Sequence, residues 1–169
     1  MSAAQRQVFE TIRSGPRGIV QGPLRVWLHS PELATRSQAL GAYCRYETGL
    51  PARWTELAII TIGAFWRAGF EWHVHAPLAE AAGIPPDAIE AIRKGEEPAS
   101  LAADEFTILR VTRSLIADRT VPPALFAEAA AQLGAKGLVD LVGLIGYYSY
   151  IAMTIVAFEV ETPGGDPFC

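Results

Sequence analysis

The feature that most constrains the fold is a long apolar segment near the C-terminus, residues 136–160. Its apolar side chains recur at helical spacing and cover most of the circumference of a helix, and Gly143 and Gly146 interrupt them. A helix that is apolar on most sides is buried in a core or at an interface. Glycine on such a helix allows another backbone to come close. We therefore predict a buried helix here, packed against neighbouring helices.

The rest of the chain also has helical periodicity, and no segment shows a convincing strand pattern. A second strongly apolar stretch, residues 57–62, lies within a predicted helix that Pro51 opens and Gly69 closes as a left-handed cap. Ser30, Pro31 and Glu32 form a helix-start signature. These patterns predict an all-α bundle of six to eight helices, with helices at about 31–48, 51–67, 70–82, 88–94, 100–118, 122–133 and 136–160.

The length of 169 residues suits one domain. We expect this domain at 23–161, after an N-terminal arm of residues 1–22 that holds a short helix and before a C-terminal tail of residues 162–169. Half of the residues are hydrophobic and only 19% are charged, which favours a subunit interface in a homo-oligomer. No run approaches 18 uninterrupted apolar residues, so we expect no membrane span.

Charge and cysteine content narrow the range of partners. The net charge is −4 and the chain has only two lysines, so the basic patch of a nucleic-acid-binding protein is missing. Cys44 and Cys169 are the only cysteines and form no CxxC motif. We therefore expect no disulfide framework and a reducing, cytoplasmic setting.

The segment from Glu71 to His75 concentrates the chemistry of the chain. It holds two of the three histidines, and Glu71 and His75 are four residues apart. On a helix that spacing puts both side chains on one face, whereas His73 points elsewhere. A carboxylate beside an imidazole is typical of a proton-transfer pair, half of a metal site or a buried ion pair.

Three segments resemble the carboxymuconolactone decarboxylase family, which includes the alkylhydroperoxidase D (AhpD)-like proteins. They are Leu50 to Ile60, then Phe70 to Ala79 with the following Ala-Ala-Gly-Ile-Pro, and Leu138 to Tyr148. The resemblance covers roughly residues 20–160. It implies an AhpD-like all-α fold and assembly as a homo-oligomer, either a trimer or a hexamer.

The resemblance also separates two branches of the family. The peroxidase branch carries C-x-x-C-x-x-x-H, with a glutamate twelve residues before the first cysteine. When this pattern is aligned on His75, the glutamate matches Glu56, but Ala68 and Glu71 stand at the cysteine positions. A thiol peroxidase needs both thiols, so we expect no such activity. Glu71 before His75 matches the decarboxylase branch, from which Glu56 is a departure.

The expected function is therefore a cofactor-free, decarboxylase-like reaction on a small organic acid or lactone from aromatic catabolism. His75 would be the acid/base, and Glu71 would set its tautomer and raise its pKa. Glu56 is 19 residues from His75, about 28 Å along one straight helix at ~1.5 Å per residue, so the two can meet only if the helix breaks near Gly69.

Four further residues are candidates for binding the substrate. Trp72 and Tyr148 are aromatic side chains suited to a pocket, and a tyrosine hydroxyl can donate to an oxyanion. Arg45 and His29 are candidate contacts to an anion, and the guanidinium of Arg45 suits a carboxylate.

Two other functions fit the same residues. In a non-catalytic binding or scaffold oligomer, Glu71 and His75 would form a structural ion pair, and Glu56 would pair with Arg53 or Arg67. In a metal-dependent enzyme, Glu56, Glu71 and His75 would supply two carboxylates and one imidazole. The sequence does not identify the substrate.

Overall fold

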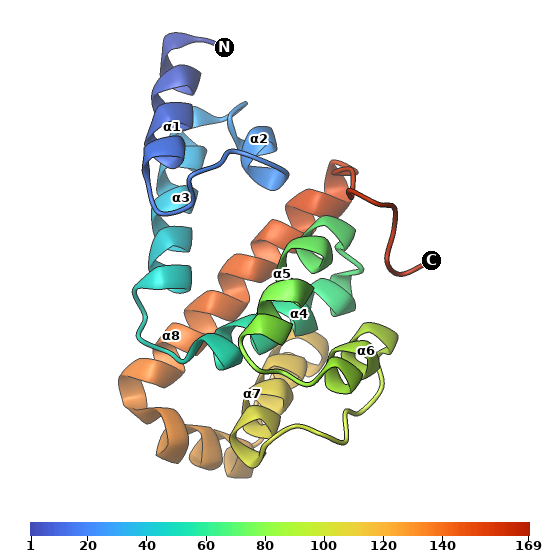
Figure 1. Ribbon diagram of the computed structural model, residues 1–169. Helices are drawn as coiled ribbons and strands as arrows, with labels where there is room; N and C mark the ends of the chain where they lie inside the picture. The colour runs from blue at the N-terminus through green and yellow to red at the C-terminus, as the bar shows by residue number, and fades with distance from the viewer.

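A computed structural model describes all residues, 1–169, and contains eight α-helices and no strand (Figure 1). This confirms the predicted all-α fold. The helices are α1 (Ala3–Ser14), α2 (Pro23–Trp27), α3 (Pro31–Tyr46), α4 (Ala52–Trp66), α5 (Gly69–Ala81), α6 (Pro86–Lys94), α7 (Ala103–Arg113) and α8 (Pro123–Ala157), with one π-helical turn, η1 (Ser114–Asp118), after α7.

Helix α4 is the centre of the core and packs most extensively against α5, α8 and α7. Residues 55–63 of α4 are all buried, as expected for a segment that is apolar nearly all round. The polar residues in this run include Glu56, whose side chain is buried. Because burying a charged group without a partner is costly, Glu56 needs a partner nearby.

The turn between α4 and α5 differs from the sequence prediction. Arg67, not Gly69, adopts the left-handed conformation, with φ 50°, and Gly69 begins α5. Gly69 is required for a different reason, because a Cβ there would lie 2.5 Å from Oγ1 of Thr162 in the C-terminal tail. The tight turn folds α5 back along α4, which brings residues far apart in the chain close together.

Helix α8 is broken at Gly134, where φ is 69° and ψ is 174°. The two parts, residues 123–133 and 135–157, correspond to the two helices predicted on either side of this glycine, and Figure 1 shows the change of direction between them. Helix α7 begins three residues later than predicted and ends at Arg113, where the π-helical turn takes over.

Helix α8 is apolar and long enough to cross a membrane by length and composition alone, and its most apolar 18-residue window has a mean hydropathy of 1.5. However, 56% of this window is buried inside the protein, and α8 packs against α3, α4 and α7. These contacts are those of a core helix.

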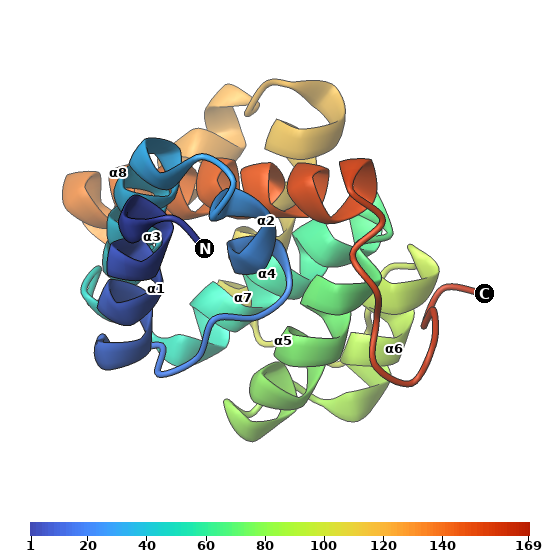
Figure 2. The same ribbon diagram turned by 90° about the horizontal axis from the view of Figure 1, so that it is seen from above.

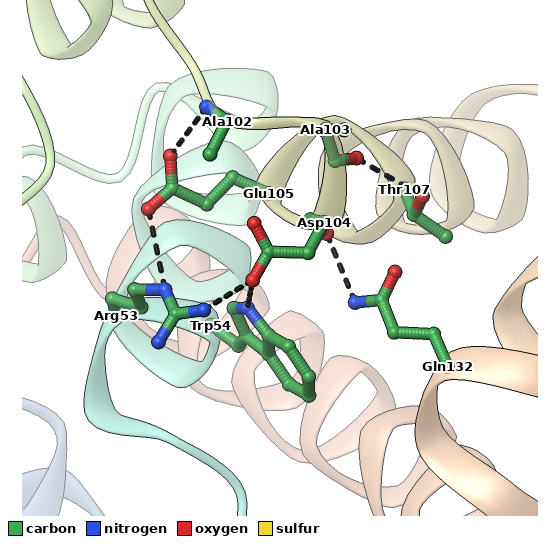
Figure 3. Close-up of polar contacts among 8 residues, drawn as sticks. All are labelled: Arg53, Trp54, Ala102, Ala103, Asp104, Glu105, Thr107 and Gln132. Atoms are coloured by element: carbon green, nitrogen blue, oxygen red, sulfur yellow. Dashed lines mark hydrogen bonds and ion pairs between the residues drawn. The ribbon is translucent and has the colours of Figure 1, made fainter.

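A polar cluster joins the start of α4 to α7 and α8 (Figure 3). Trp54 Nε1 donates to the Asp104 carboxylate at 3.0 Å, and Gln132 Nε2 donates to the Asp104 carbonyl oxygen at 3.0 Å. Arg53 pairs with Asp104 and, at 3.5 Å, with Glu105. Arg53 is therefore paired with carboxylates of α7 and is not the partner of Glu56. The predicted Glu56–Arg53 ion pair of the scaffold alternative is wrong.

The N-terminal segment folds onto one side of α8 (Figure 2). Val8 and Ile12 of α1 are buried in the core. The short helix α2 was not predicted, and Trp27 at its end stacks on Tyr150 at 4.7 Å and donates through Nε1 to the Thr154 hydroxyl at 3.0 Å. The proposed boundary at residue 22 therefore falls just before a segment that is tied to α8.

Candidate active site

The centre of the candidate site is a hydrogen bond between α4 and α5. His75 Nδ1 lies 2.7 Å from Glu56 Oε2, and both side chains are buried. A carboxylate only accepts hydrogen bonds, so Nδ1 donates and the neutral imidazole carries its lone pair on Nε2. The predicted Glu71–His75 pair is wrong: the fold-back of α5 supplies Glu56 as the partner of His75 instead.

Burial determines the protonation of His75. Desolvation lowers the pKa of His75 below 6.5, and it outweighs the hydrogen bond and charge of Glu56, which raise it. The positive charges of Arg45 and Arg17 lower the pKa further. The sequence-based expectation of a raised pKa is therefore wrong, because the imidazole lies in the core. At neutral pH, His75 is an unprotonated base.

Glu71 lies in the first turn of α5 with both carboxyl oxygens buried and without a hydrogen-bond partner in the protein. Burial raises the pKa of Glu71 well above 4.5. Burial therefore favours the protonated form of Glu71, in which the carboxyl group is a hydrogen-bond donor rather than an ion-pair partner.

Glu71 and His75 line one cavity of about 60 Å³, together with Tyr148 from α8. The Tyr148 hydroxyl is buried without a partner, and burial raises the pKa of Tyr148 well above 10. Its ring packs edge-on against the His75 ring, with centroids 5.2 Å apart. The cavity has the volume of a few water molecules, which suits a small ligand. Its other lining residues are Arg17, Gln21, Pro23, Leu24, Arg45, Phe70, Val74, Ile151 and Ile155.

The structure thus brings Glu71, His75, Tyr148 and Arg45 together at one cavity, with Glu56 behind His75. Two predicted contacts lie elsewhere. Trp72 packs against Phe168 of the tail, because its position on α5 faces away from the cavity.

His29, the second predicted contact that lies elsewhere, is exposed just after the end of α2 and lines a separate surface hollow. His73 is exposed, as its helical position predicts. The Glu56, Glu71 and His75 side chains do not form a cluster of metal-ligand geometry.

The sequence reasoning missed Arg17 and Gln21, which reach the cavity from the segment between α1 and α2. Their sequence context of glycine and proline indicated only an irregular arm. No pattern in that segment could place it against a cavity formed by α5 and α8, because the contact depends on the tertiary packing of Trp27 on α8.

The two cysteines do not take part in this cavity. Cys44 is buried in α3 and Cys169 is exposed at the end of the tail, and neither is among the lining residues. Ala68 is buried at one of the positions where the peroxidase pattern has a thiol. The site as built therefore contains acid/base groups and no thiol.

Replacing Glu56 with glutamine is expected to lower the pKa of His75 further. The substitution removes the carboxylate charge and the charge-assisted hydrogen bond, which are the two influences that raise this pKa. NMR titration of the histidine ring nitrogens measures the change, with His29→Gln and His73→Gln spectra assigning the signals. A higher pKa of His75 in the Glu56→Gln variant would contradict this account of the pair.

Comparisons with known proteins agree with this fold. A protein of unknown function from Agrobacterium tumefaciens, described as a candidate antioxidant defence protein AhpD, superposes with a TM-score of 0.74 at 18% identity, covering 86% of this chain and 100% of that one. An uncharacterized peroxidase-related protein from Silicibacter sp. TM1040 superposes with a TM-score of 0.75 at 13% identity, covering 95% of this chain and 85% of that one. At these identities the likeness shows the fold alone.

The structure is thus that of an all-α protein with an AhpD-like fold. The sequence profile described as the carboxymuconolactone decarboxylase family matches residues 31–117, just over half of the chain. The chain belongs to the carboxymuconolactone decarboxylase family. A search of the curated proteins found no match.

Proposed function

We propose that the protein is a cofactor-free enzyme that forms an enolate from a small organic acid or lactone and moves a proton at the reacting carbon. The observation that carries the proposal is the pairing of a neutral base with two unpartnered buried donors at one cavity. His75 is the base, and the Glu71 carboxyl and the Tyr148 hydroxyl are the donors. Family membership supports decarboxylation as the specific reaction.

The two donors suit a developing negative charge. Burial favours the protonated forms of Glu71 and Tyr148 because it raises their pKa values, and neither group has a hydrogen-bond partner within the protein. Donors that are already in place where an enolate oxygen forms stabilise it without a reorganisation cost in the transition state. A carboxylic acid kept neutral by an apolar site serves this purpose in other enolate-forming enzymes.

In a decarboxylation, the bond between the carboxylate and the neighbouring carbon breaks, CO2 leaves, and the electron pair stays on the substrate as an enolate. The enolate oxygen accepts hydrogen bonds from Glu71 and Tyr148. His75, protonated at Nε2 by solvent, then delivers this proton to the carbon, and the Glu56 carboxylate stabilises the transient imidazolium through Nδ1. The lowered pKa of His75 makes that imidazolium a stronger acid.

This proposal is tested by release of CO2 from carboxymuconolactone and from other small carboxylated lactones. We expect turnover by the purified protein with neither thiol nor added cofactor. If none of these compounds releases CO2, the decarboxylase assignment is contradicted. Retained activity after alkylation of both cysteines is expected, because neither lines the cavity. We also propose a role in aromatic catabolism for this lyase, and a cytoplasmic location, which the two unpaired cysteines support.

We also propose that the protein acts as a homo-oligomer. Helix α8 carries a stripe of positions spaced three and four residues apart, 139, 142, 146, 149, 153 and 156, in which Gly146 and Ser149 stand between two pairs of apolar residues. Val139, Val142, Met153 and Val156 in this stripe are exposed. Nothing lies within 4 Å of a Cβ placed at Gly146, so a helix of a second copy has room to approach.

Substituting Val142 with glutamate is expected to dissociate the oligomer, because it buries a charge within the stripe. Light scattering coupled to size-exclusion chromatography measures the mass, which should fall from a multiple of 18.2 kDa to that of the monomer. The exposed Glu80→Gln substitution on α5 should leave the mass unchanged. A wild-type mass of 18.2 kDa would contradict the proposal.

A further inference from the structure

Two arginine side chains line the cavity without an acidic partner. Arg17 comes from the segment between α1 and α2, and Arg45 lies on α3. The guanidinium of Arg17 donates to the Tyr147 hydroxyl at 3.0 Å, while that of Arg45 lies over the Tyr46 ring. The Nε of Arg17 is buried and has no hydrogen-bond partner. Both guanidinium groups are partly buried, so water screens their charges less than at the surface, and neither has a counterion in the protein.

The acidic groups near the cavity do not neutralise these cations. Glu56 is bonded to His75 and does not line the cavity. Glu71 lines it, but burial raises the pKa of this carboxyl group and so disfavours its charged form. The charges of Arg17 and Arg45 both act on His75 and on Tyr148, which places them around the same space. The cavity as a whole is therefore positive, and a small anion complements it.

The structure holds Arg17 in place at this site. A Cβ at position 41 of α3 would overlap both the Tyr147 hydroxyl and the Arg17 guanidinium, so only glycine leaves room for their contact. Five residues after Arg17, the chain passes close to Phe70. A Cβ at Gly22, where φ is 52°, would overlap the Phe70 ring. The segment is thus anchored on both sides of Gln21, against α3 and α8 and against α5.

We propose that Arg17 and Arg45 together bind a carboxylate of the substrate that does not react, and that the N-terminal segment thereby determines specificity. The inference rests on the proposed function for the identity of the reacting group. A carboxylate held by two guanidinium groups is stabilised as it stands, so the carboxylate that leaves must lie elsewhere, towards His75 and Tyr148. The planar guanidinium fork matches a carboxylate through paired hydrogen bonds. Arg17 lies outside residues 31–117, the part of the chain that matches the family.

Calorimetric titration of the full-length protein with malonate tests the proposal, since binding of this unreactive acid is independent of turnover. We expect malonate to bind and the uncharged malonamide not to bind. Arg17→Gln and Arg45→Gln should each weaken malonate binding at least tenfold, because each removes a charge-assisted contact. The malonate affinity of Arg17→Lys should lie between those of the wild type and Arg17→Gln. Arg6→Gln, at an exposed position on α1, is the matched control and should bind malonate as the wild type does.

A second variant moves Arg17 without removing its charge. Gly41→Ala should weaken malonate binding as much as Arg17→Gln does, in protein whose circular dichroism shows the native helix content. Malonate should also raise the pKa of His75 in NMR titrations of the wild type, because a bound anion offsets the two cations. This rise should be smaller in Arg17→Gln, an effect that a purely structural role of Arg17 would not produce.

Several results would overturn the inference. They are equal malonate binding by wild type and Arg17→Gln, equal binding of malonate and malonamide, tighter binding of inorganic phosphate than of malonate, or no malonate binding at all. Its failure differs from failure of the proposed function. His75→Gln should bind malonate like the wild type while losing turnover, so loss of arginine dependence would leave the role of His75 intact. Arginine-dependent malonate binding without any turnover would contradict the proposed function and leave the binding role of the two arginines intact.

Discussion

Replacing His75 with glutamine is expected to lower the rate of CO2 release by roughly 100-fold or more, the usual contribution of a positioned acid/base. Glutamine fills a similar volume and can still hydrogen-bond to Glu56, but it cannot carry a proton to the substrate. The rate constant kcat, measured from CO2 release at saturating substrate, is the relevant quantity. The Michaelis constant should change little, because the arginines rather than His75 hold the substrate.

The matched control for this prediction is His73→Gln, the same substitution two residues away on the exposed side of α5. It should retain wild-type kcat. Thermal unfolding of both variants should stay close to that of the wild type, which shows that the loss in His75→Gln is chemical. Equal kcat for His75→Gln and the wild type would exclude His75 as the acid/base.

Replacing Glu71 with glutamine is expected to stabilise the protein at neutral and alkaline pH. The pKa of Glu71 is well above 4.5 in the folded protein, so above pH 4.5 the folded state holds a proton that the unfolded state releases. Below pH 4.5 the protonated carboxyl group therefore adds no ionisation penalty to folding. As pH rises from 4.5 towards the folded pKa, the unfolding equilibrium constant increases by up to tenfold per pH unit, and the protein loses stability. Glutamine does not titrate and avoids this loss.

Thermal unfolding at pH 4.5 and at pH 8 measures the effect. The Glu71→Gln variant should gain stability relative to the wild type as pH rises, with roughly 2–4 °C in Tm for each kcal/mol recovered. Glu80→Gln, an exposed position on the same helix, should show no such trend. A Tm difference that does not change with pH would mean that Glu71 is ionised in the folded state.

The same residue links stability to function. Glu71→Leu removes the hydrogen-bond donor as well as the titrating group, so we expect kcat to fall by roughly 100-fold, as for loss of one oxyanion donor. A variant that is more stable and less active is the expected result for a buried group retained for catalysis. Wild-type kcat in Glu71→Leu would exclude the donor role.

Much of the fold could be predicted because its determinants are local. The apolar segments at 57–62 and 136–160, the break at Gly134 and the helix starts near Pro31 and Pro86 follow from helical periodicity and backbone constraints. The turn between α4 and α5 was predicted in the right place but with the wrong residue. The left-handed conformation falls on Arg67, while the tail packs against Gly69 and requires its small size.

The site could be predicted only in part. The positions of Glu56, Glu71 and His75 were visible in the sequence, but their pairing was not, because the register of α5 on α4 decides which carboxylate reaches the imidazole. The direction of the His75 pKa also depends on how deeply the fold buries it. Arg17 had no sequence signal, since its role depends on the space that Gly41 leaves beside Tyr147.

The central claim is that His75 delivers a solvent-derived proton to carbon at this cavity. The most direct test is turnover of carboxymuconolactone in D2O, with the product analysed by NMR and mass spectrometry in parallel with CO2 release. We expect one carbon-bound deuterium from solvent in the wild-type product, on a carbon that shares the delocalised negative charge of the enolate, formed at a rate that falls with kcat in His75→Gln. A product formed without solvent deuterium, or formed equally fast by His75→Gln, would contradict it.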